Sequence, residues 1–255
     1  MSDWNSSQYM KFAAQRTRPS FDLIGRLFDI SPKRVLDLGC GPGNSTALLA
    51  DRFKDADICG LDGSPQMLES ARQNHPELRF EECLLPDGLS RIEGSYDLIF
   101  SNACIHWIPD QAGLISAVYQ KLEKGGVFAV QIPLTDRALF YKLLNRLVSA
   151  EKWQKLSCIK NFHSLSSEGY YDALTALFEK IDMWETVYYH TVDSADGVLE
   201  WYKGSGLRPY LDALSAEQKE QFISDLKKEI SQNFGIQKDG KIILKMPRLF
   251  FTATK

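Results

Sequence analysis

The chain has 255 residues, of which 44% are hydrophobic and 25% are charged, values typical of a soluble globular protein. Its net charge of −3 gives no basic excess that would favour nucleic acid as a partner. No apolar run reaches the roughly 18 residues of a membrane span, and the N-terminus lacks the apolar core of a signal peptide. The five cysteines are scattered without zinc-like spacing, so we expect no metal site and a reducing cytoplasm.

The first half of the chain alternates between helical and strand-like patterns. Helices are expected over residues 5–17 and from Pro19, which suits a first helical turn, to Phe28. Gly125 and Gly126 are expected to separate a helix from the strand that follows it. The expected strands cover about 34–38, 57–61, 78–83, 96–102 and 127–132, and the expected helices between them about 45–53, 65–74 and 111–122. This alternation predicts a parallel sheet with helices on both faces.

The pattern changes after Pro133. Helical spacing dominates residues 136–180, 195–203 and 215–234, and strand-like runs cover 184–190 and about 241–253. We interpret these runs as the last two strands of the same sheet. The expected fold is therefore α/β, a doubly wound, mostly parallel seven-stranded sheet with a helical cap inserted in the C-terminal half. We expect one domain, 1–255, with a core of about 19–132, 183–192 and 240–255 and cap elements of about 3–18, 133–182 and 193–239.

The most informative stretch is RVLDLGCGPGNS at 34–45, in which an apolar run meets glycines at alternate positions from Gly39. A strand that turns into a helix through glycines brings main-chain N–H groups close to a ligand. The dinucleotide fingerprint is GxGxxG, whose backbone cradles a pyrophosphate. Here the spacing is GxGxG, Pro42 interrupts it and Asp37 precedes it. A carboxylate beside the loop disfavours a pyrophosphate and favours a cationic end group such as an α-amino group.

Two further strand ends carry polar residues at the same expected edge of the sheet. Asp62 ends the second strand, where a carboxylate can accept hydrogen bonds from both ribose hydroxyls of an adenosine. Ser101 and Asn102 end the fourth strand. S-adenosylmethionine contains an adenosine, a sulfonium and an amino acid but no phosphate, so the loop, Asp37 and Asp62 fit its parts in turn. The alternative is that the glycines only allow tight packing of a strand–helix corner.

With these motifs the sequence resembles the class I S-adenosylmethionine-dependent methyltransferases. Further pieces are similar to the trans-aconitate 2-methyltransferase family: MSDWN, DLGCGPGNSTALL, SNACIHWIPD, TVYYH, GLRPYL and PRLF. They are spread over nearly the whole chain, and the similarity is weakest between about residues 133 and 180.

The resemblance implies roles around the methyl donor. The methionine part would be lined by Gly39, Cys40, Gly41 and Asn44, and its α-amino group would be bound by the main-chain carbonyls of Asn102 and Ala103. The ribose would be held by Asp62, and the adenine would lie beside Gly63 and Met67. Ile105 and Trp107 would form the wall of the methyl-transfer site. Many relatives place an acidic residue after the third strand to accept from the adenine amino group. Here the segment reads EECLL, so Cys83 and Leu84 would serve through backbone groups and apolar contact.

An ionised carboxylate needs no general base to accept a methyl group. It needs its oxygen held in line with the methyl carbon while water is excluded. Arginine forks suit this task because they bind a carboxylate with two parallel hydrogen bonds. The candidates are Arg16, Arg18, Arg208 and Arg248. Each of them alone is better explained as a surface ion pair, whereas together they predict at least one contact with the acceptor.

Aromatic residues and histidines supply further candidates for positioning the acceptor. Tyr9 lies on an expected lid helix, and its alternative role is simple packing. Tyr188, Tyr189 and His190 lie in an expected strand, whose alternation lets one of the two tyrosines face the core. His106 would be a base if the acceptor were a hydroxyl or an amine, although a lining or hydrogen-bonding role is favoured.

The leading hypothesis is a methyltransferase that forms a methyl ester on a small, trans-aconitate-like polycarboxylate. One alternative is transfer to another small molecule or to an acceptor on a carrier protein, for which Lys152, Lys155 and Lys160 offer a basic surface that a solvated helix face explains equally well. A cofactor-binding protein without catalysis and, more remotely, a nicotinamide dehydrogenase are also left open. The sequence does not indicate an oligomeric state.

Overall fold

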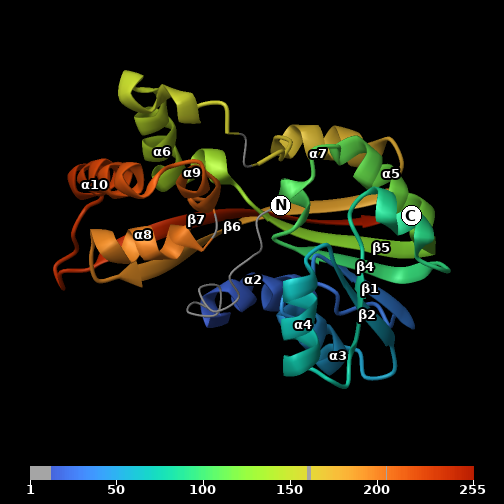
Figure 1. Ribbon diagram of the computed structural model, residues 1–255. Helices are drawn as coiled ribbons and strands as arrows, with labels where there is room; N and C mark the ends of the chain where they lie inside the picture. The colour runs from blue at the N-terminus through green and yellow to red at the C-terminus, as the bar shows by residue number, and fades with distance from the viewer. Residues whose placement is uncertain (1–12, 160–161, 205) are drawn as a thin grey trace.

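A computed structural model of the protein describes residues 13–159, 162–204 and 206–255, without the side chains of residues 13–16. The strands of this part form one seven-stranded sheet in the order β3-β2-β1-β4-β5-β7-β6 (Figure 1). They are β1 (Arg34–Leu38), β2 (Asp57–Asp62), β3 (Arg79–Glu82), β4 (Tyr96–Asn102), β5 (Leu122–Pro133), β6 (Lys180–Val192) and β7 (Ile242–Thr254). β7 runs antiparallel to β5 and β6, and the other strand pairs are parallel. The expected mostly parallel sheet is confirmed.

Several of the helices begin at capping residues. They are α2 (Ala13–Gly25), α3 (Asn44–Arg52), α4 (Pro65–Asn74), α5 (Gln111–Lys121), α6 (Leu139–Ser149), α7 (Ser167–Thr175), α8 (Ala195–Lys203), α9 (Arg208–Asp212) and α10 (Ala216–Asn233). Short 3₁₀ helices lie at η1 (Asp87–Arg91), η2 (Ile105–Trp107), η3 (Thr135–Arg137) and η4 (Glu151–Leu156). Ser64 caps α4 and accepts from the Met67 N–H, while Ser215 and Gln218 form a capping box at α10.

Two local expectations were wrong. Pro19 lies inside α2 rather than in a first turn, because burial of Leu23 and Ile24 against the sheet holds the helix together despite one missing backbone donor. The glycine pair Gly125–Gly126 lies within β5, which begins at Leu122. The pairing register of β4 and β5 shifts beside it, so these glycines accommodate an irregularity in a strand rather than end a helix.

Helices cover both faces of the sheet, so its strands are apolar almost throughout. Side chains of α2 and α3 pack with Val35, Ile58 and Phe100 in one core cluster. Side chains of α5 and α7 pack with Leu36 and Val130 in the cluster on the opposite face. Figure 1 shows the two helix layers on either side of the strands. The chain order of the strands reverses between β1 and β4, where open α/β sheets bind ligands at the carboxyl ends of the strands.

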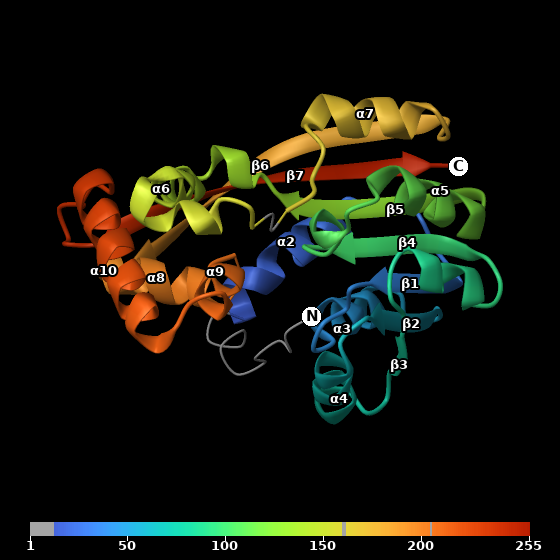
Figure 2. The ribbon, with the colours of Figure 1, turned by 45° about the horizontal axis from the view of Figure 1, so that its top comes forward.

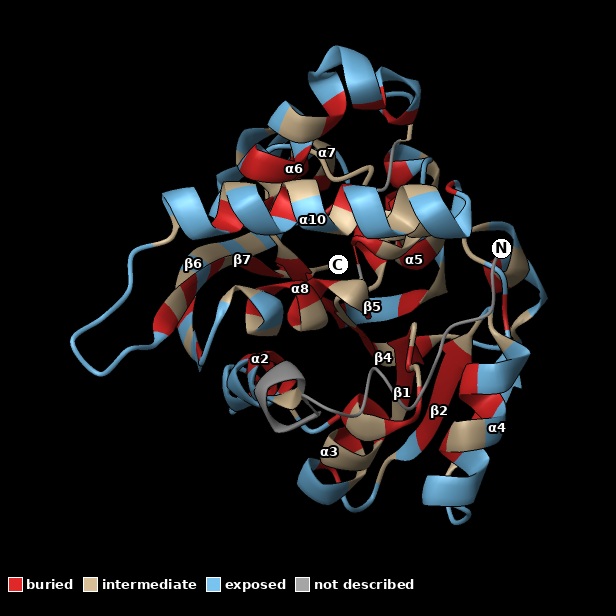
Figure 3. Cartoon of the chain, turned by 60° about the vertical axis from the view of Figure 1, so that its left-hand side comes forward, coloured by how far each residue is buried: buried red, intermediate tan, exposed pale blue. Residues whose placement is uncertain are grey.

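β6 and β7 continue beyond the end of β5. The last pair between β5 and β7 joins Pro133 to Arg248, and residues 242–247 of β7 pair with β6. The helices α6, α8, α9 and α10 gather over this extension, apart from α5 and α7 (Figure 2). In α10 the buried residues Phe222, Leu226 and Ile230 recur every four positions, and the opposite side of the helix is exposed (Figure 3). This group of helices therefore stands beside the carboxyl ends of the central strands.

Candidate functional site

The glycine loop after β1 is held by backbone hydrogen bonds to the end of β2. The N–H groups of Gly39 and Cys40 donate to the Leu61 carbonyl oxygen at 2.7 and 3.0 Å. Gly39 has a φ of 71°, and a Cβ there would lie 2.2 Å from the Sγ of Cys104, so only glycine fits. Gly41 also has a positive φ, 55°, but no atom lies within 4 Å of the position of its Cβ. The loop thus leaves open space on the side of Gly41.

Asp62 fixes the neighbouring turn through both carboxylate oxygens. Its Oδ2 accepts from the Gly41 N–H at 2.9 Å, and its Oδ1 accepts from the Ser64 N–H at 2.8 Å. Burial raises the pKa of this carboxyl above its ordinary value. The carboxylate therefore links the loops after β1 and β2, at the place expected for a ribose.

Asp37 is fully buried beneath the loop. The hydroxyls of Ser45 and Thr46 donate to its Oδ2 at 2.6 and 2.7 Å, which ties the start of α3 to β1. Its Oδ1 has no hydrogen-bond partner among the described residues. Burial raises the pKa of Asp37 to about 6. Its carboxyl therefore gains from a cationic ligand group nearby, as expected for an α-amino group.

The end of β4 supplies the third part of this edge. Ala103 has a φ of 52°, in the left-handed region that non-glycine residues rarely adopt, and its N–H donates to the Gln131 carbonyl oxygen at 2.9 Å. The Oδ1 of Asn102 is buried and has no partner within the described part of the chain. Strained backbone and an unpaired buried oxygen at a strand end are features of ligand sites.

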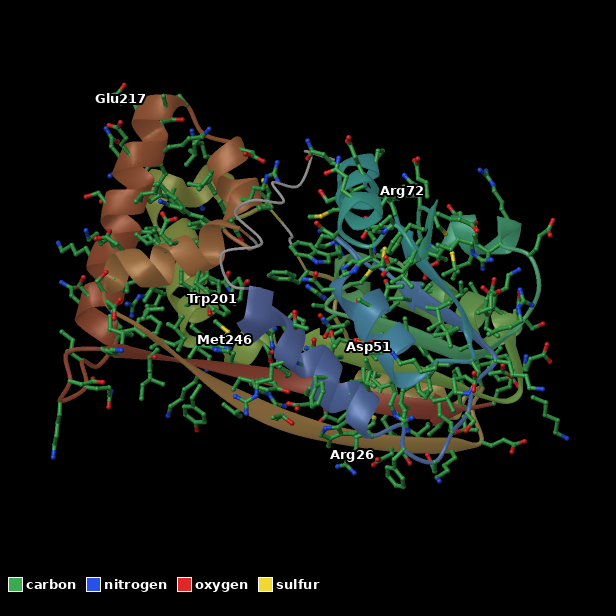
Figure 4. The ribbon with its side chains drawn as sticks, turned by 90° about the horizontal axis from the view of Figure 1, so that it is seen from below. Arg26, Asp51, Arg72, Trp201, Glu217 and Met246 are labelled. Carbon is green, nitrogen blue, oxygen red and sulfur yellow. The ribbon has the colours of Figure 1, made fainter. Side chains whose placement is uncertain are left out.

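A cavity beside Ala103 is lined by several aromatic side chains, including those of Tyr141 in α6 and Tyr202 in α8; we call it the aromatic cavity. Trp201 of α8 and Met246 of β7, both labelled in Figure 4, contribute to its lining. Its lining also includes Pro19, His106, Trp107, Gln131, Pro133, Leu134, Thr135, Ala138, Tyr141, Phe162, Tyr202, Pro247 and Arg248. None of these residues is Asp or Glu, and Arg248 is the one lining residue described here that carries a formal charge at neutral pH.

His106 lies in the wall of this cavity as a neutral imidazole. It is 3% exposed, and its ring packs against Trp107 and Phe162 with centroid distances of 5.0 and 5.3 Å. Burial, with a smaller contribution from the charge of Arg248, lowers the pKa of His106 to about 3. Such a group is a weak proton acceptor at neutral pH, which supports the expected lining role over a role as base.

The structure brings three expected acceptor residues to the cavity: His106, Trp107 and Arg248. Tyr188 is buried, as the alternation of the strand allowed, and its hydroxyl donates to the Asp22 Oδ2 at 2.5 Å rather than lining the cavity. Tyr9 and the side chain of Arg16 lie outside the described residues.

Three expected site residues do not line the aromatic cavity. Tyr189 is 60% exposed because it points to the opposite face of β6 from Tyr188. Arg208, at the start of α9, is not part of the cavity lining, and its Nε lies 3.5 Å from the Asp212 Oδ2. Ile105 is fully buried in the core cluster on the α5 face, since η2 turns it inward while His106 faces the cavity.

The remaining expected donor residues stay predictions. Cys40, Met67 and Cys83 are buried, so any contact with a ligand would come from their backbone or a small part of the side chain. Leu84 is 59% exposed and its Cδ1 is the nearest atom, at 3.3 Å, to a Cβ built on Gly63, which suits an apolar contact with a base. Asn44 begins α3 beside a groove shared with Arg18 and Phe21 of α2.

Sequence reasoning missed Gln131. It is 1% exposed, lines the aromatic cavity, and its Nε2 has no hydrogen-bond partner among the residues described. The signal was present, because an amide interrupts the apolar run VFAVQI at the carboxyl end of a buried strand. Tyr141 and Tyr202, which also line the cavity, were missed for a different reason. They lie in expected helices after residue 133, outside the motifs recognised there.

The described residues also bear on membrane and metal partners. No helix among them has the length and apolar character needed to cross a membrane. No group of three or more His, Cys, Asp or Glu side chains in this part of the chain is arranged to hold a metal ion.

Comparison with known proteins identifies the family. A family model described as a methyltransferase domain matches residues 12–186. The trans-aconitate 2-methyltransferase of Rhodopseudomonas palustris strain HaA2 is 36% identical over 263 residues, covering 100% of both chains, and that of Methylobacterium nodulans is 38% identical over 258 residues, covering 100% of this chain and 99% of the other. The chain belongs to the trans-aconitate 2-methyltransferase family. Its resemblance to that family in sequence motifs is thereby confirmed.

Solved structures show the same fold as this member of the family. Phosphoethanolamine N-methyltransferase 2 of Haemonchus contortus, in complex with S-adenosyl-L-methionine, matches with a TM-score of 0.58 at 17% identity, covering 93% of this chain and 52% of the other. The YcgJ protein of Bacillus subtilis matches with a TM-score of 0.59 at 18% identity, covering 93% and 98%. The expected class I methyltransferase fold is therefore confirmed.

Proposed function

We propose that this member of the family transfers the methyl group of S-adenosylmethionine to a carboxylate of a small polycarboxylic acid such as trans-aconitate. The observation that carries the proposal is the charge of the aromatic cavity. Arg248 brings a guanidinium to it, none of its described lining residues is acidic, and its histidine is neutral. An anion gains from this arrangement, whereas a cationic amine does not.

The residues on the donor side fit S-adenosylmethionine. Asp62 stands where the ribose is expected, and the unpaired Oδ1 of Asp37 and Oδ1 of Asn102 are acceptors for a cationic amino group. S-adenosylmethionine bound there would supply a methyl group on a sulfonium sulfur. Transfer would break the bond from sulfur to this carbon, leave the electron pair on sulfur and form a bond from the carbon to a carboxylate oxygen of the acceptor. The protein binds both partners, orients them and excludes water.

No proton has to be removed from an ionised carboxylate, because its pKa lies far below neutral. A hydroxyl or amine acceptor would need a base near the reacting atom. The titratable imidazole among the described lining residues is His106, whose pKa is lowered to about 3. The chemistry of the cavity therefore favours a carboxylate over a hydroxyl or an amine.

The carrier-protein alternative loses its main support. Lys152 forms an ion pair with Asp225 at 2.6 Å, and Lys155 donates to the Gln218 Oε1 at 3.1 Å, so both contribute to packing of η4 against α10. Lys160 lies outside the described residues.

We further propose that the chain works as a single domain in the cytoplasm. Strands from both halves of the sequence share one sheet, which supports a single unit. Cys40, Cys59 and Cys83 are buried free thiols, which supports a reducing compartment.

The test is methyl transfer from labelled S-adenosylmethionine to a panel of carboxylic acids, amines and phenols. We expect label on polycarboxylic acids, in a product from which mild base releases methanol, as a methyl ester does. Transfer to amines or phenols, with none to any carboxylate, would contradict the proposal.

Two matched arginine variants locate the acceptor site. Arg248→Met should raise the KM for the acid by about tenfold or more, because it removes a charge-assisted contact worth roughly 1.5–3 kcal/mol. Arg208→Met should leave this KM within about twofold, since Arg208 lies outside the cavity lining. Equal effects of the two variants would contradict the assignment of Arg248.

A further inference from the structure

Polar side chains form a row across three neighbouring strands, and two of them, Gln131 and Arg248, line the aromatic cavity. Asn102 of β4 pairs in register with Gln131 of β5, so the two side chains point to the same face of the sheet. Arg248 of β7 pairs with Pro133, two positions beyond Gln131 on that same face. Gln131 and Arg248 are therefore diagonal neighbours across the β5–β7 ladder, within reach of one small ligand.

A second buried glutamine shows what is unusual about Gln131. Gln111 is 4% exposed and satisfies its amide within the protein: its Nε2 donates to the carbonyl oxygens of Ile105 and Ile108 at 2.7 and 2.6 Å, and its Oε1 accepts from the Tyr170 hydroxyl at 2.8 Å. The Nε2 of Gln131 has no partner in the described part of the chain. A buried polar group without a partner costs free energy that a ligand can recover. Gln131 therefore has the character of a binding residue.

The row also has a direction. At its donor end, the Gln131 carbonyl oxygen accepts from the Ala103 N–H, which ties the residue to the strand end expected to hold the amino-acid part of the methyl donor. At the other end, Arg248 lies one strand farther along the sheet order and is separated from β4 by β5. A ligand that spans the row has one end beside the donor and the other at the guanidinium.

We propose that Gln131 hydrogen-bonds the carboxylate that receives the methyl group, while Arg248 holds a second carboxylate of the same acceptor. This inference rests on the proposed function. It assigns different tasks to the two residues: Gln131 acts on the rate of transfer, and Arg248 acts on the binding of the acid. The preferred acceptor is accordingly an acid with two carboxylates placed to reach both residues.

The chemistry of the two donors explains this division. An arginine fork engages both oxygens of a carboxylate in charge-assisted hydrogen bonds, which withdraws electron density from them and makes them poorer nucleophiles. A neutral amide N–H donates a weaker bond to one oxygen and leaves the second free to react. His106, as a neutral neighbour in the same wall, adds no positive charge beside the reacting oxygen.

The experiment crosses two variants with two acceptors: a dicarboxylic acid methylated by the wild-type protein, and its monoamide, in which the carboxylate that is not methylated becomes a carboxamide. Gln131→Met should lower kcat by about tenfold or more with the acid KM within about threefold. It should keep the wild-type preference for the diacid. Arg248→Met should raise the KM for the diacid by about tenfold and treat diacid and monoamide alike, because the contact that distinguishes them is gone.

Folding and donor binding are controlled separately. Calorimetric titration with S-adenosylhomocysteine should give the wild-type Kd for Gln131→Met and Arg248→Met, which excludes a general loss of structure. The inference is overturned if Gln131→Met retains the wild-type kcat, or if it loses the preference for the diacid as Arg248→Met does. If the wild-type protein methylates no carboxylic acid at all, the proposed function itself fails, and this outcome is distinct from the other two.

Discussion

The donor side and the acceptor side of the site are built in different ways. The donor side consists of loops that directly follow β1, β2 and β4. Hydrogen bonds to Asp37 and Asp62 fix the first two loops, and a bond from Ala103 to Gln131 fixes the third. The acceptor side is a cavity of side chains from α2, η2, β5, α8 and β7, in which Arg248 carries the formal charge. Carboxylates therefore face the expected cationic donor, and a guanidinium faces the proposed anionic acceptor. The contrast shows how one sheet edge separates two ligands by charge.

The strongest way to break the donor side is to crowd its loop. Gly39→Ala combines a positive φ with a Cβ 2.2 Å from the Cys104 Sγ, so we expect a loss of about 3–4 kcal/mol in the free energy of unfolding. Gly41→Ala is the matched control, since its φ is also positive but its Cβ meets no atom within 4 Å; it should lose about 1–2 kcal/mol. Urea denaturation of the ligand-free proteins measures both, and equal losses would show that the contact with Cys104 is not limiting.

The buried carboxyl of Asp37 should give the donor side its own dependence on pH. Its folded pKa of about 6 lies above its ordinary value of 3.8, so the folded protein holds this proton more tightly than the unfolded chain. This proton contributes about 3 kcal/mol to the free energy of unfolding. The contribution is fully present below about pH 4 and is lost as the pH rises through 6.

Asp37→Asn removes this titration. The variant should not lose stability between about pH 4 and 7 as the wild-type protein does. The wild-type affinity for S-adenosylhomocysteine should rise over the same range, and that of the variant should not, because no carboxylate forms beside the amino group. Urea denaturation and calorimetry across this range check the two effects. A wild-type protein whose stability rises from pH 5 to 7 relative to Asp37→Asn would show that the folded pKa is not raised.

A smaller effect distinguishes glutamines on the two sides of the sheet. Gln111→Met should lower the free energy of unfolding by about 2–3 kcal/mol, since it removes three hydrogen bonds that satisfy buried groups. Gln131→Met should change it by less than about 1 kcal/mol, because its Nε2 bonds to no described protein group. Thermal or urea unfolding compares them directly. A loss for Gln131→Met as large as that for Gln111→Met would assign Gln131 to the scaffold rather than to the acceptor.

The same contrast explains what the sequence could predict. The donor side depends on Asp37, the glycine loop and Asp62, which lie within about 25 residues of one another. The pattern of this short stretch indicates a strand, a turn and the end of the next strand, so local periodicity was enough to predict the donor site. β4 was predicted with its exact bounds because polar residues flank a continuous apolar run. The sequence did not show that Tyr189 and Arg208 lie outside the lining of the aromatic cavity. A strand pattern does not say which face meets the cavity, and a short motif such as GLRP does not say where its helix packs.

Gln131 and Arg248 show the limit most clearly. They lie more than a hundred positions apart in the sequence, and they become neighbours through the register of an antiparallel pair, Pro133 with Arg248. Nothing in either segment fixes that register by itself, because pairing of strands depends on burial across the whole sheet. The acceptor cavity therefore forms only in the assembled fold, whereas the donor loop is a local motif in one stretch of the sequence.

The most direct test of the central claim is a crossed calorimetric titration of the wild-type protein, Asp62→Ala and Arg248→Met with S-adenosylhomocysteine and with a dicarboxylic acid in its presence. We predict that Asp62→Ala weakens binding of S-adenosylhomocysteine by roughly 1–3 kcal/mol and that Arg248→Met keeps this affinity but loses the acid by about tenfold or more. If Arg248→Met binds the acid as tightly as the wild-type protein, or loses both ligands equally, the separation of the two sides by charge is contradicted.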